Sequence, residues 1–144
     1  MCECKASVLV VDDTAFNIMP VRALLKAHYK IDIDIATNGL EAVEKFREGL
    51  NQTCGCSLRV PRLIIMDIGM PIMDGKEASS LINREQKKVM VQGDGELTHI
   101  VALTSFSNKA LKEECMAVGM KKVYNKPLKL IMLQEMMHNH FFRV

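Results

Sequence analysis

Two patterns of hydrophobic and polar residues alternate along this chain: short apolar runs, and longer segments with hydrophobic residues at helical spacing. The short runs lie at 7–11, 63–66, 100–103 and 122–124. A further segment, 31–35, alternates strictly between isoleucine and aspartate. Continuous apolar runs of this length predict buried strands, whereas strict alternation predicts a strand with one polar face, near a sheet edge.

Each of these five segments is followed by one in which hydrophobic residues recur every three or four positions, the pattern of an amphipathic helix. The predicted helices cover 14–29, 40–49, 76–88, 108–118 and 128–140. Asp13 or Thr14 is placed to cap the first helix, and Pro20 should kink that helix because it removes a backbone donor. Strands that alternate with helices predict an α/β fold, a doubly wound five-stranded parallel sheet with five helices on its two faces.

Length and composition fit one compact domain spanning residues 1–144, with a core at about 7–141. The formal net charge is only +2 and no long Lys/Arg run occurs, so the sequence indicates neither nucleic-acid binding nor contact with an anionic membrane. No run approaches the roughly 18 apolar residues of a membrane span. The N-terminus also lacks the apolar stretch of a signal peptide.

Five cysteines occur as two Cys-x-Cys pairs, Cys2 with Cys4 and Cys54 with Cys56, and as the single Cys115. This odd number is a poor disulfide framework and favours a reducing, cytoplasmic (intracellular) setting. The two pairs could supply a Cys₄ zinc site, but zinc ligands usually have two or more residues between the cysteines. We therefore do not expect zinc.

Polar residues stand at the carboxyl ends of four predicted strands. They are Asp12 and Asp13, Asp67, Thr104, and Lys126. Because the carboxyl ends of parallel strands share one edge of the sheet, we expect these side chains to meet in one site. Taken singly, each has a plainer interpretation: an aspartate that caps a helix, a hydroxyl at a strand end, or a surface lysine. Together they are more informative, because three converging carboxylates repel one another unless a metal cation or the lysine compensates them.

This set of side chains suits a divalent cation and one phosphoryl group. Mg²⁺ prefers oxygen ligands and usually takes few carboxylates together with a phosphate oxygen. Asp67 is our candidate nucleophile, since carboxylates form aspartyl phosphates and its neighbours can supply the metal and hydrogen-bond donors. Thr104 would donate to one phosphoryl oxygen and Lys126 would pair with another, which leaves the third for the metal.

Three other motifs are weaker candidates. Residues 69–76 contain glycines and a Gly-Lys pair, but the interval is one residue too long for a phosphate-binding P-loop. Asp32 and Asp34 resemble the Asp-x-Asp of haloacid-dehalogenase-type phosphatases, but they lie within the alternating segment rather than at a strand end. The four histidines show no metal-type pairing except His138-x-His140.

Four motifs make the chain similar to the receiver domains of response regulators in two-component phosphorelays. They are Val10-Val11-Asp12-Asp13, Met66-Asp67 with Met70-Pro71-x-Met73-Asp74-Gly75, Leu103-Thr104, and Lys126-Pro127, in the family's order and approximate spacing. The resemblance covers about residues 7–141. Phe16-Asn17-Ile18 and Met73-Asp74-Gly75 look most like receivers attached to hybrid histidine kinases, often eukaryotic ones.

The resemblance implies a flavodoxin-like receiver fold with strand order 2-1-3-4-5. The site residues that it implies are the phosphoacceptor Asp67, the Mg²⁺ ligands Asp12, Asp13, Asp67 and the Gly69 carbonyl, and the phosphoryl-contacting Thr104 and Lys126. It also implies a cis Lys126-Pro127 bond. In this family the donor is a phosphohistidine on a histidine kinase or a histidine phosphotransfer protein. We therefore expect a signalling phosphoacceptor that helps catalyse its own phosphorylation and dephosphorylation, rather than an enzyme, acting as a monomer or weak dimer.

The chain departs from the family pattern in three places. Val123 stands at the aromatic switch position three residues before Lys126, and Tyr124 comes one place later, with its side chain on the opposite face of the strand. Gly69 replaces a side chain that often tunes dephosphorylation. The loop at 51–61 is longer than typical.

Two alternative functions remain open from the sequence: a Mg²⁺-dependent phosphohydrolase that uses an aspartyl phosphate, and an interaction domain that is not phosphorylated. A cap insertion for a diffusible substrate is not evident, and the complete set of acidic and basic residues argues against a silent domain. We expect either a stand-alone receiver or a fragment of a hybrid kinase.

Overall fold

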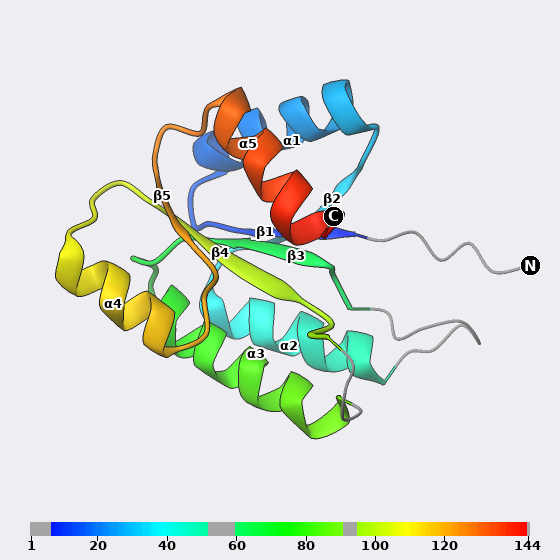
Figure 1. The fold of residues 1–144 in the computed structure, drawn as a ribbon, viewed down its shortest axis with the longest axis vertical. Coiled ribbons are helices and arrows are strands. Elements are labelled where there is room, and N and C mark those ends of the chain that lie inside the picture. The colour runs from blue at the N-terminus through cyan, green and yellow to red at the C-terminus, as the bar shows by residue number, and fades with distance from the viewer. Residues whose placement is uncertain (1–6, 52–59, 91–94, 144) are drawn as a thin grey trace, which may run out of the picture.

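A computed structural model describes residues 7–51, 60–90 and 95–143. In these residues, strands and helices alternate as the hydrophobic pattern predicts (Figure 1). In chain order the elements are β1 (Val8–Val11), α1 (Ala15–Tyr29), β2 (Ile33–Ala36), α2 (Gly39–Leu50), β3 (Leu63–Met66), α3 (Gly75–Val89), β4 (His99–Thr104), α4 (Lys109–Ala117), β5 (Val123–Asn125), α5 (Leu130–Met136) and the π-helical η1 (Met137–Phe141). The alternation confirms the predicted α/β class.

The five strands form one parallel sheet in the order β2-β1-β3-β4-β5. This is the order that the receiver resemblance implies, and it places β2 at an edge, as its alternating pattern predicts. β2 runs from Ile33 to Ala36 rather than over 31–35, because its register follows β1, with Val8 opposite Ile33 and Val11 opposite Ala36.

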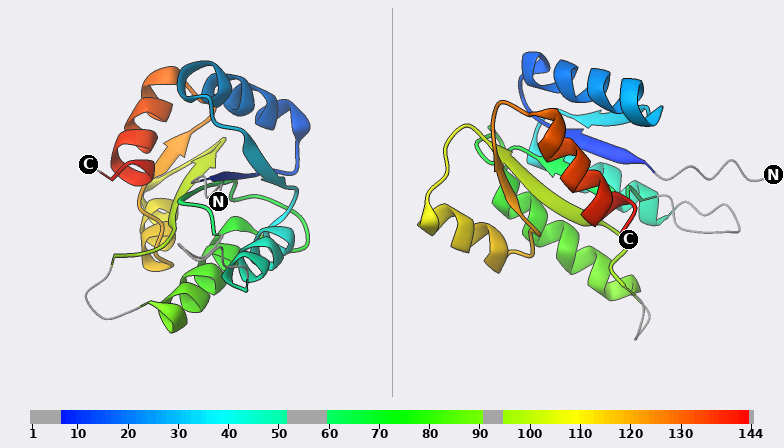
Figure 2. Two further views of the ribbon diagram at one scale, coloured as in Figure 1. Left: turned by 90° about the vertical axis from the view of Figure 1, so that its right-hand side faces the viewer. Right: turned by 45° about the horizontal axis from the view of Figure 1, so that its top comes forward.

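Helices cover both faces of the sheet: α1 and α5 lie on one face, and α2, α3 and α4 on the other (Figures 1 and 2). Because successive side chains of a strand point to opposite faces, alternate residues enter two separate cores. Leu9 and Val11 pack in the core that contains Phe46 of α2, whereas Val8 and Val10 pack in the core that contains Leu25 of α1. The unbroken apolar run of β1 therefore reflects burial on both faces.

Two helices differ in detail from the sequence prediction. α1 continues through Pro20 without a break, although the missing N–H removes one helical hydrogen bond. The last helix begins at Leu130 rather than at residue 128, because Lys129 before it has an extended backbone (φ −110°, ψ 151°). Its final residues, Met137–Phe141, continue as a π-helix.

Cys115 is the one cysteine among the described residues, and it is free and buried in α4. Burial raises the pKa of its thiol, so this residue behaves as part of the core. Cys2, Cys4, Cys54 and Cys56 lie outside the described residues. Among the described helices, none is long and apolar enough to cross a membrane.

The end of the chain packs against the amino-terminal ends of the central strands. The Arg143 guanidinium donates hydrogen bonds to the backbone carbonyls of Glu96 (2.6 Å), Arg62 (2.7 Å), His140 (2.9 Å) and Leu97 (3.0 Å). In return, Nε of Arg62 donates to the Phe141 carbonyl at 2.7 Å. These contacts hold η1 to the segments that precede β3 and β4.

Candidate functional site

The carboxyl ends of four neighbouring strands position the predicted site residues. Asp12 follows β1, Asp67 follows β3, Thr104 ends β4 and Lys126 follows β5. The parallel ladder continues into these positions, since the Asp67 amide donates to the Val11 carbonyl (2.9 Å) and the Lys126 amide to the Thr104 carbonyl (2.7 Å). The pairing of the strands thus brings together side chains that are more than 100 residues apart in sequence.

Lys126 lies between two of the carboxylates. Its Nζ is 2.8 Å from Oδ2 of Asp12 and 3.4 Å from Oδ1 of Asp67. Burial acts to lower the pKa of Lys126, but the hydrogen bond to Asp12 and the charge of Asp67 outweigh it, so this pKa lies above its ordinary value. The ammonium is therefore fully charged at neutral pH. The Lys126–Pro127 peptide bond is cis, as the resemblance implies.

Asp67 is buried, with 7% of its surface exposed. Burial raises the pKa of its carboxyl above the ordinary value, and the neighbouring charge of Asp12 raises it further. Lys126 opposes this shift but does not cancel it. Burial is thus the larger cause of the shift, and the three clustered carboxylates lie beside the Lys126 ammonium, which contacts two of them.

Asp12, Asp13 and Asp67 can together offer a metal ion three carboxylate oxygens that lie within 4.8 Å of one another. Asp12 and Asp67 are buried, and Asp13 is exposed at the mouth of the site. A cluster of hard oxygen donors, partly open to solvent and short of positive charge, fits a divalent cation such as Mg²⁺, which keeps several waters in its coordination shell. The donor set therefore passes a chemical test for the cation that the sequence predicts.

The plainer interpretation of the two aspartates, as caps of α1, is not what the structure shows. Thr14 occupies the N-cap position and makes no capping hydrogen bond with its side chain. Oδ1 of Asp12 instead accepts from the Thr14 amide (2.9 Å) and from Nδ2 of Asn17 (3.4 Å). Asn17 thus helps to orient Asp12, a role that the sequence analysis missed.

Thr104 is buried at the end of β4, and its hydroxyl donates to the backbone carbonyl of Phe106 at 3.2 Å. Val123, at the aromatic switch position, packs against the core under α2, α3 and α4. Tyr124 lies in the opposite core, as predicted, and its hydroxyl donates to Glu135 of α5 at 2.9 Å. An aromatic ring therefore does not stand at the switch position on the Thr104 side.

Gly75, known from the sequence only as part of a family motif, has a structural role in the loop after Asp67. A Cβ added to Gly75 would lie 2.1 Å from the Asp67 carbonyl oxygen, so only glycine fits this close approach. The Gly75 amide also donates to the Ile68 carbonyl at 2.9 Å. A Cβ on Gly69 would meet open space, which leaves the backbone there accessible. The Asp74-Gly75 pair in the sequence was a signal for this loop.

Of the three weaker candidates, residues 69–76 form the loop after Asp67 and the start of α3, whereas the aspartates of the alternating segment and the histidines lie away from this site. Asp32 and Asp34 belong to the β2 edge and its approach, where Asp34 pairs with Lys45 at 2.8 Å. His138 and His140 do not pair with each other: Nδ1 of His140 lies 3.1 Å from Nδ1 of His99. This pair joins residues 41 positions apart, so local spacing could not reveal it.

Comparison with known proteins agrees with the fold and the geometry. Residues 8–138 match the family of response regulator receiver domains. Hybrid signal transduction histidine kinase B of Dictyostelium discoideum is 36% identical over 126 residues, which cover 85% of this chain and 6% of that kinase. Two-component response regulator 24 of Arabidopsis thaliana is 32% identical over 144 residues, which cover 100% of this chain and 90% of that protein.

Solved structures give the same result. A co-crystal structure of the Saccharomyces cerevisiae histidine phosphotransfer protein Ypd1 and the receiver domain of Ssk1 matches with a TM-score of 0.75 and 29% identity, over 91% of this chain and 85% of that chain. The CheX–CheY–BeF₃–Mg²⁺ complex of Borrelia burgdorferi matches with a TM-score of 0.73 and 26% identity, over 92% and 87% of the two chains. The chain therefore belongs to the response regulator receiver family.

Proposed function

We propose that this receiver domain accepts a phosphoryl group on Asp67 from a phosphohistidine. The observation that carries the proposal is the position of Lys126, whose Nζ lies 3.4 Å from the Asp67 carboxylate and 2.8 Å from that of Asp12. A buried carboxylate beside a fixed ammonium is a nucleophile with charge stabilisation already in place. Membership of the family favours this signalling role over the phosphohydrolase that the sequence left open.

In the proposed transfer, a carboxylate oxygen of Asp67 attacks the phosphorus atom. A phosphorus–oxygen bond forms, the phosphorus–nitrogen bond breaks, and its electron pair returns to the imidazole of the donor. Lys126 stabilises the charge on the phosphoryl oxygens, which requires no large movement because its Nζ already reaches Asp67. The Thr104 hydroxyl turns from the Phe106 carbonyl, its present acceptor, to a phosphoryl oxygen.

The residues that would hold Mg²⁺ are Asp12, Asp13, Asp67 and the backbone carbonyl of Gly69. When bound, the cation supplies positive charge that neutralises the phosphoryl oxygens and the crowded carboxylates. Asp12 is the most firmly oriented of these ligands, because Thr14, Asn17 and Lys126 all donate to its carboxylate. Asp13 is exposed and is therefore the one that is free to adjust its position.

Exposed hydrophobic side chains around the site suit a protein partner rather than a diffusible substrate. Each of the four strands that form the site is followed by at least one such residue: Phe16 and Met19 after β1, Ile72 after β3, Phe106 after β4, and Ile131 after β5. Every one of these side chains is at least 65% exposed. Large apolar side chains that stay exposed beside a polar site indicate a surface that binds a protein partner. We propose that a histidine kinase or a histidine phosphotransfer protein docks here and presents its phosphohistidine to Asp67.

Four broader proposals concern the domain as a whole. The family match at 8–138 supports a single receiver domain with its core at about 7–141. The odd number of cysteines supports an intracellular site of action. We further propose that the domain promotes its own phosphorylation and dephosphorylation, and that it acts as a monomer or weak dimer.

Intact-mass spectrometry after incubation with acetyl phosphate tests the main proposal. The native chain should gain one phosphoryl group in the presence of Mg²⁺ and not in its absence, and hydroxylamine should remove it. Asp67→Asn should gain none, whereas Asp74→Asn, which changes a helix cap at the end of the same loop, should gain one as the native chain does. Equal mass gain in Asp67→Asn would overturn the proposal.

A further inference from the structure

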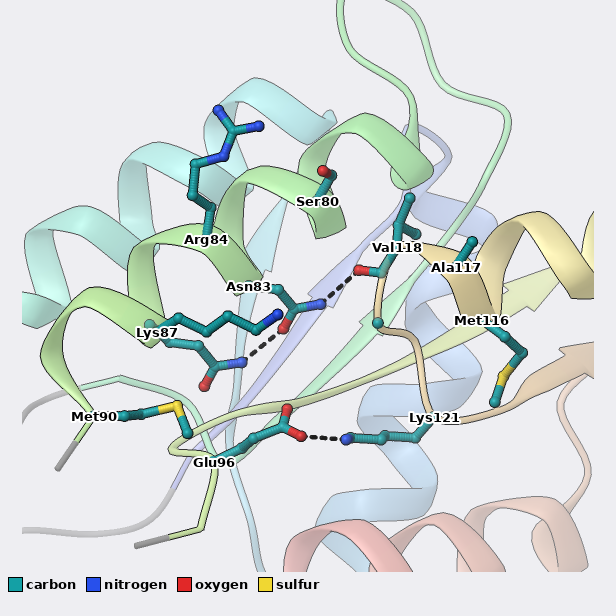
Figure 3. Close-up of a pocket in the computed structure, with 12 residues that line it drawn as sticks. Ser80, Asn83, Arg84, Lys87, Met90, Glu96, Met116, Ala117, Val118 and Lys121 are labelled. Atoms are coloured by element: carbon teal, nitrogen blue, oxygen red, sulfur yellow. Dashed lines mark hydrogen bonds and ion pairs between the residues drawn. The ribbon is translucent and has the colours of Figure 1, made fainter. Parts of the chain in front are cut away.

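A hollow of about 570 Å³ lies between α3 and the segment that joins α4 to β5 (Figure 3). Its lining residues are Ser80, Asn83, Arg84, Gln86, Lys87 and Met90 of α3 and its end, Met116–Gly119 and Lys121 beyond them, and Glu96 before β4. The volume is within the range of about 300–1,000 Å³ that is usual for small-molecule sites. None of these residues belongs to the set around Asp67.

The floor of the hollow is a buried network of amide side chains. Nε2 of Gln86 donates to Oδ1 of Asn83 at 2.7 Å, and Nδ2 of Asn83 donates to the Val118 carbonyl at 2.8 Å (Figure 3). Gly119, with φ +92°, allows the close approach of the two walls, because a Cβ there would lie 2.4 Å from Asn83 Nδ2. The network fixes the two walls relative to each other, so the hollow is preformed.

The charged side chains that line the hollow are mainly cationic. Among the described residues that line the hollow, Glu96 is the only acidic one, and it pairs with Lys121. Arg84 and Lys87 therefore give the lining an excess of positive charge. In Figure 3, the Lys87 ammonium reaches toward Asn83 over the floor, whereas the exposed Arg84 side chain points outward from the same helix. An anionic group bound above Asn83 would meet the Lys87 ammonium directly, and the Arg84 guanidinium would join it by turning toward the hollow.

The remaining walls are apolar. Met90 closes the α3 end of the hollow, and Met116, Ala117 and Val118 form the side that comes from α4. Methionine side chains adapt their shape to a bound group, and Met116 is 54% exposed and so free to do this. An inorganic anion would leave these walls uncovered. We propose that the hollow binds a small organic anion whose charged group lies on Lys87 and Arg84 and whose apolar body lies between the methionines.

The test uses three probes of one shape and different charge: naphthalene-1-sulfonate, 1-naphthalenemethanol and 1-naphthylmethylammonium. Each is titrated without Mg²⁺ into the full ¹⁵N-labelled chain, and backbone and side-chain amide signals are followed by NMR. These probes carry no phosphoryl group, so the result is independent of the reaction proposed at Asp67. We expect the sulfonate alone to bind at millimolar concentration or below, with shifts at Asn83, Val118 and Gly119.

Matched variants locate the binding. Arg84→Gln with Lys87→Gln should weaken sulfonate binding about tenfold, the loss expected when charge-assisted contacts disappear. Lys88→Gln with Lys112→Gln removes the same amount of charge from α3 and α4, at positions outside the hollow, and should leave binding unchanged. Equal weakening in both pairs, equal binding of the three probes, or no shifts at Asn83 and Gly119 would each overturn the proposal. So would binding of an acidic peptide at this hollow without binding of the sulfonate.

Discussion

The two ends of the sheet are built from the same parallel strands but differ in how they treat charge. At the carboxyl end, Lys126 is shared between two buried carboxylates, and the pKa of Asp67 stays raised by burial and by Asp12. At the amino end, the guanidinium of Arg143 donates to four backbone carbonyls. The carboxyl end gathers more carboxylates than ammonium groups, whereas at the amino end backbone carbonyls accept hydrogen bonds from the Arg143 guanidinium.

The carboxyl end therefore has the character of a binding site, and the amino end that of a stabilising contact. Clustered carboxylates that lack enough positive charge repel one another and destabilise the fold. Such a cluster is therefore expected where a cation binds or where a phosphoryl group is transferred. A half-buried guanidinium with acceptors around it contributes stability and offers little to a ligand. We therefore expect changes at the carboxyl end to affect phosphorylation most, and changes at the amino end to affect unfolding alone.

The largest effect should follow loss of the site's ammonium. Lys126→Met should slow phosphorylation by acetyl phosphate roughly 10²–10³-fold, the usual loss when one group that stabilises transition-state charge is removed. Rates are measured by intact mass at fixed Mg²⁺. Lys129→Met, a change of an exposed lysine three residues away, is the control and should leave the rate as it is. An unchanged rate in Lys126→Met would mean that the carboxyl end is not a site of phosphoryl transfer.

Packing around the loop after Asp67 gives the next effect. Gly75→Ala should destabilise the fold by about 2–3 kcal/mol, because the new Cβ would lie 2.1 Å from the Asp67 carbonyl oxygen and the backbone must move. Gly69→Ala, in open space, should change stability by less than about 0.5 kcal/mol. Urea denaturation measures both. Similar stabilities for the two variants would show that the close contact at Gly75 is not maintained.

At the opposite end, Arg143→Ala should destabilise the fold by about 1.5–3 kcal/mol, since four carbonyls lose a charged donor. The phosphorylation rate of the folded variant should equal that of the native chain, which is the contrast between the two ends. Arg22→Ala, at an exposed position of α1, serves as the control for the loss of an arginine. A large drop in the phosphorylation rate of Arg143→Ala would show that the two ends are coupled.

The smallest effect concerns pH. Burial, together with Arg143 and Lys121, lowers the pKa of His99 to about 4, and burial and Lys121 lower that of His140. Between the ordinary pKa of 6.5 and about 4, the unfolded chain binds more protons than the folded chain, so stability should fall as the pH falls through this range. Above 6.5 the contribution of this pair should be constant.

A double variant isolates the contribution of the histidine pair from the carboxylates that titrate in the same range. His99→Gln with His140→Gln should show a shallower fall in urea stability between pH 6.5 and 4 than the native chain. His138→Gln, an exposed neighbour, should follow the native curve. Parallel curves for the double variant and the native chain would contradict the depressed pKa values.

The same contrast explains what the sequence could predict. At the carboxyl end, Asp12, Asp67 and Thr104 directly follow apolar runs, and Lys126 comes two residues after one. The rule that parallel strands share one edge was therefore enough to group them. Gly75 and Asn17 stand in motifs that the family resemblance marks, but their roles could not be predicted, because these depend on a close backbone approach and on a side-chain hydrogen bond that only the folded chain shows.

At the amino end, the sequence carried almost no signal. Arg62, His99 and Arg143 lie in three distant segments. The pairing of β3 with β4 brings Arg62 and His99 together, and the packing of η1 adds Arg143. The prediction of a helix over 128–140 was correct in kind. Its start at Leu130 and the π-helical form of its last residues were not predicted, because they depend on the extended backbone of Lys129 and on tertiary contacts. The order of the strands came from the family resemblance rather than from the pattern.

Locating the phosphoryl group is the most direct test of the account. The chain is phosphorylated with acetyl phosphate and Mg²⁺, reduced with borohydride to convert an aspartyl phosphate into homoserine, digested, and analysed by peptide mass spectrometry. The account predicts homoserine at position 67 and unmodified aspartate at Asp12 and Asp13. Homoserine at position 12 or 13, with Asp67 intact, would contradict it.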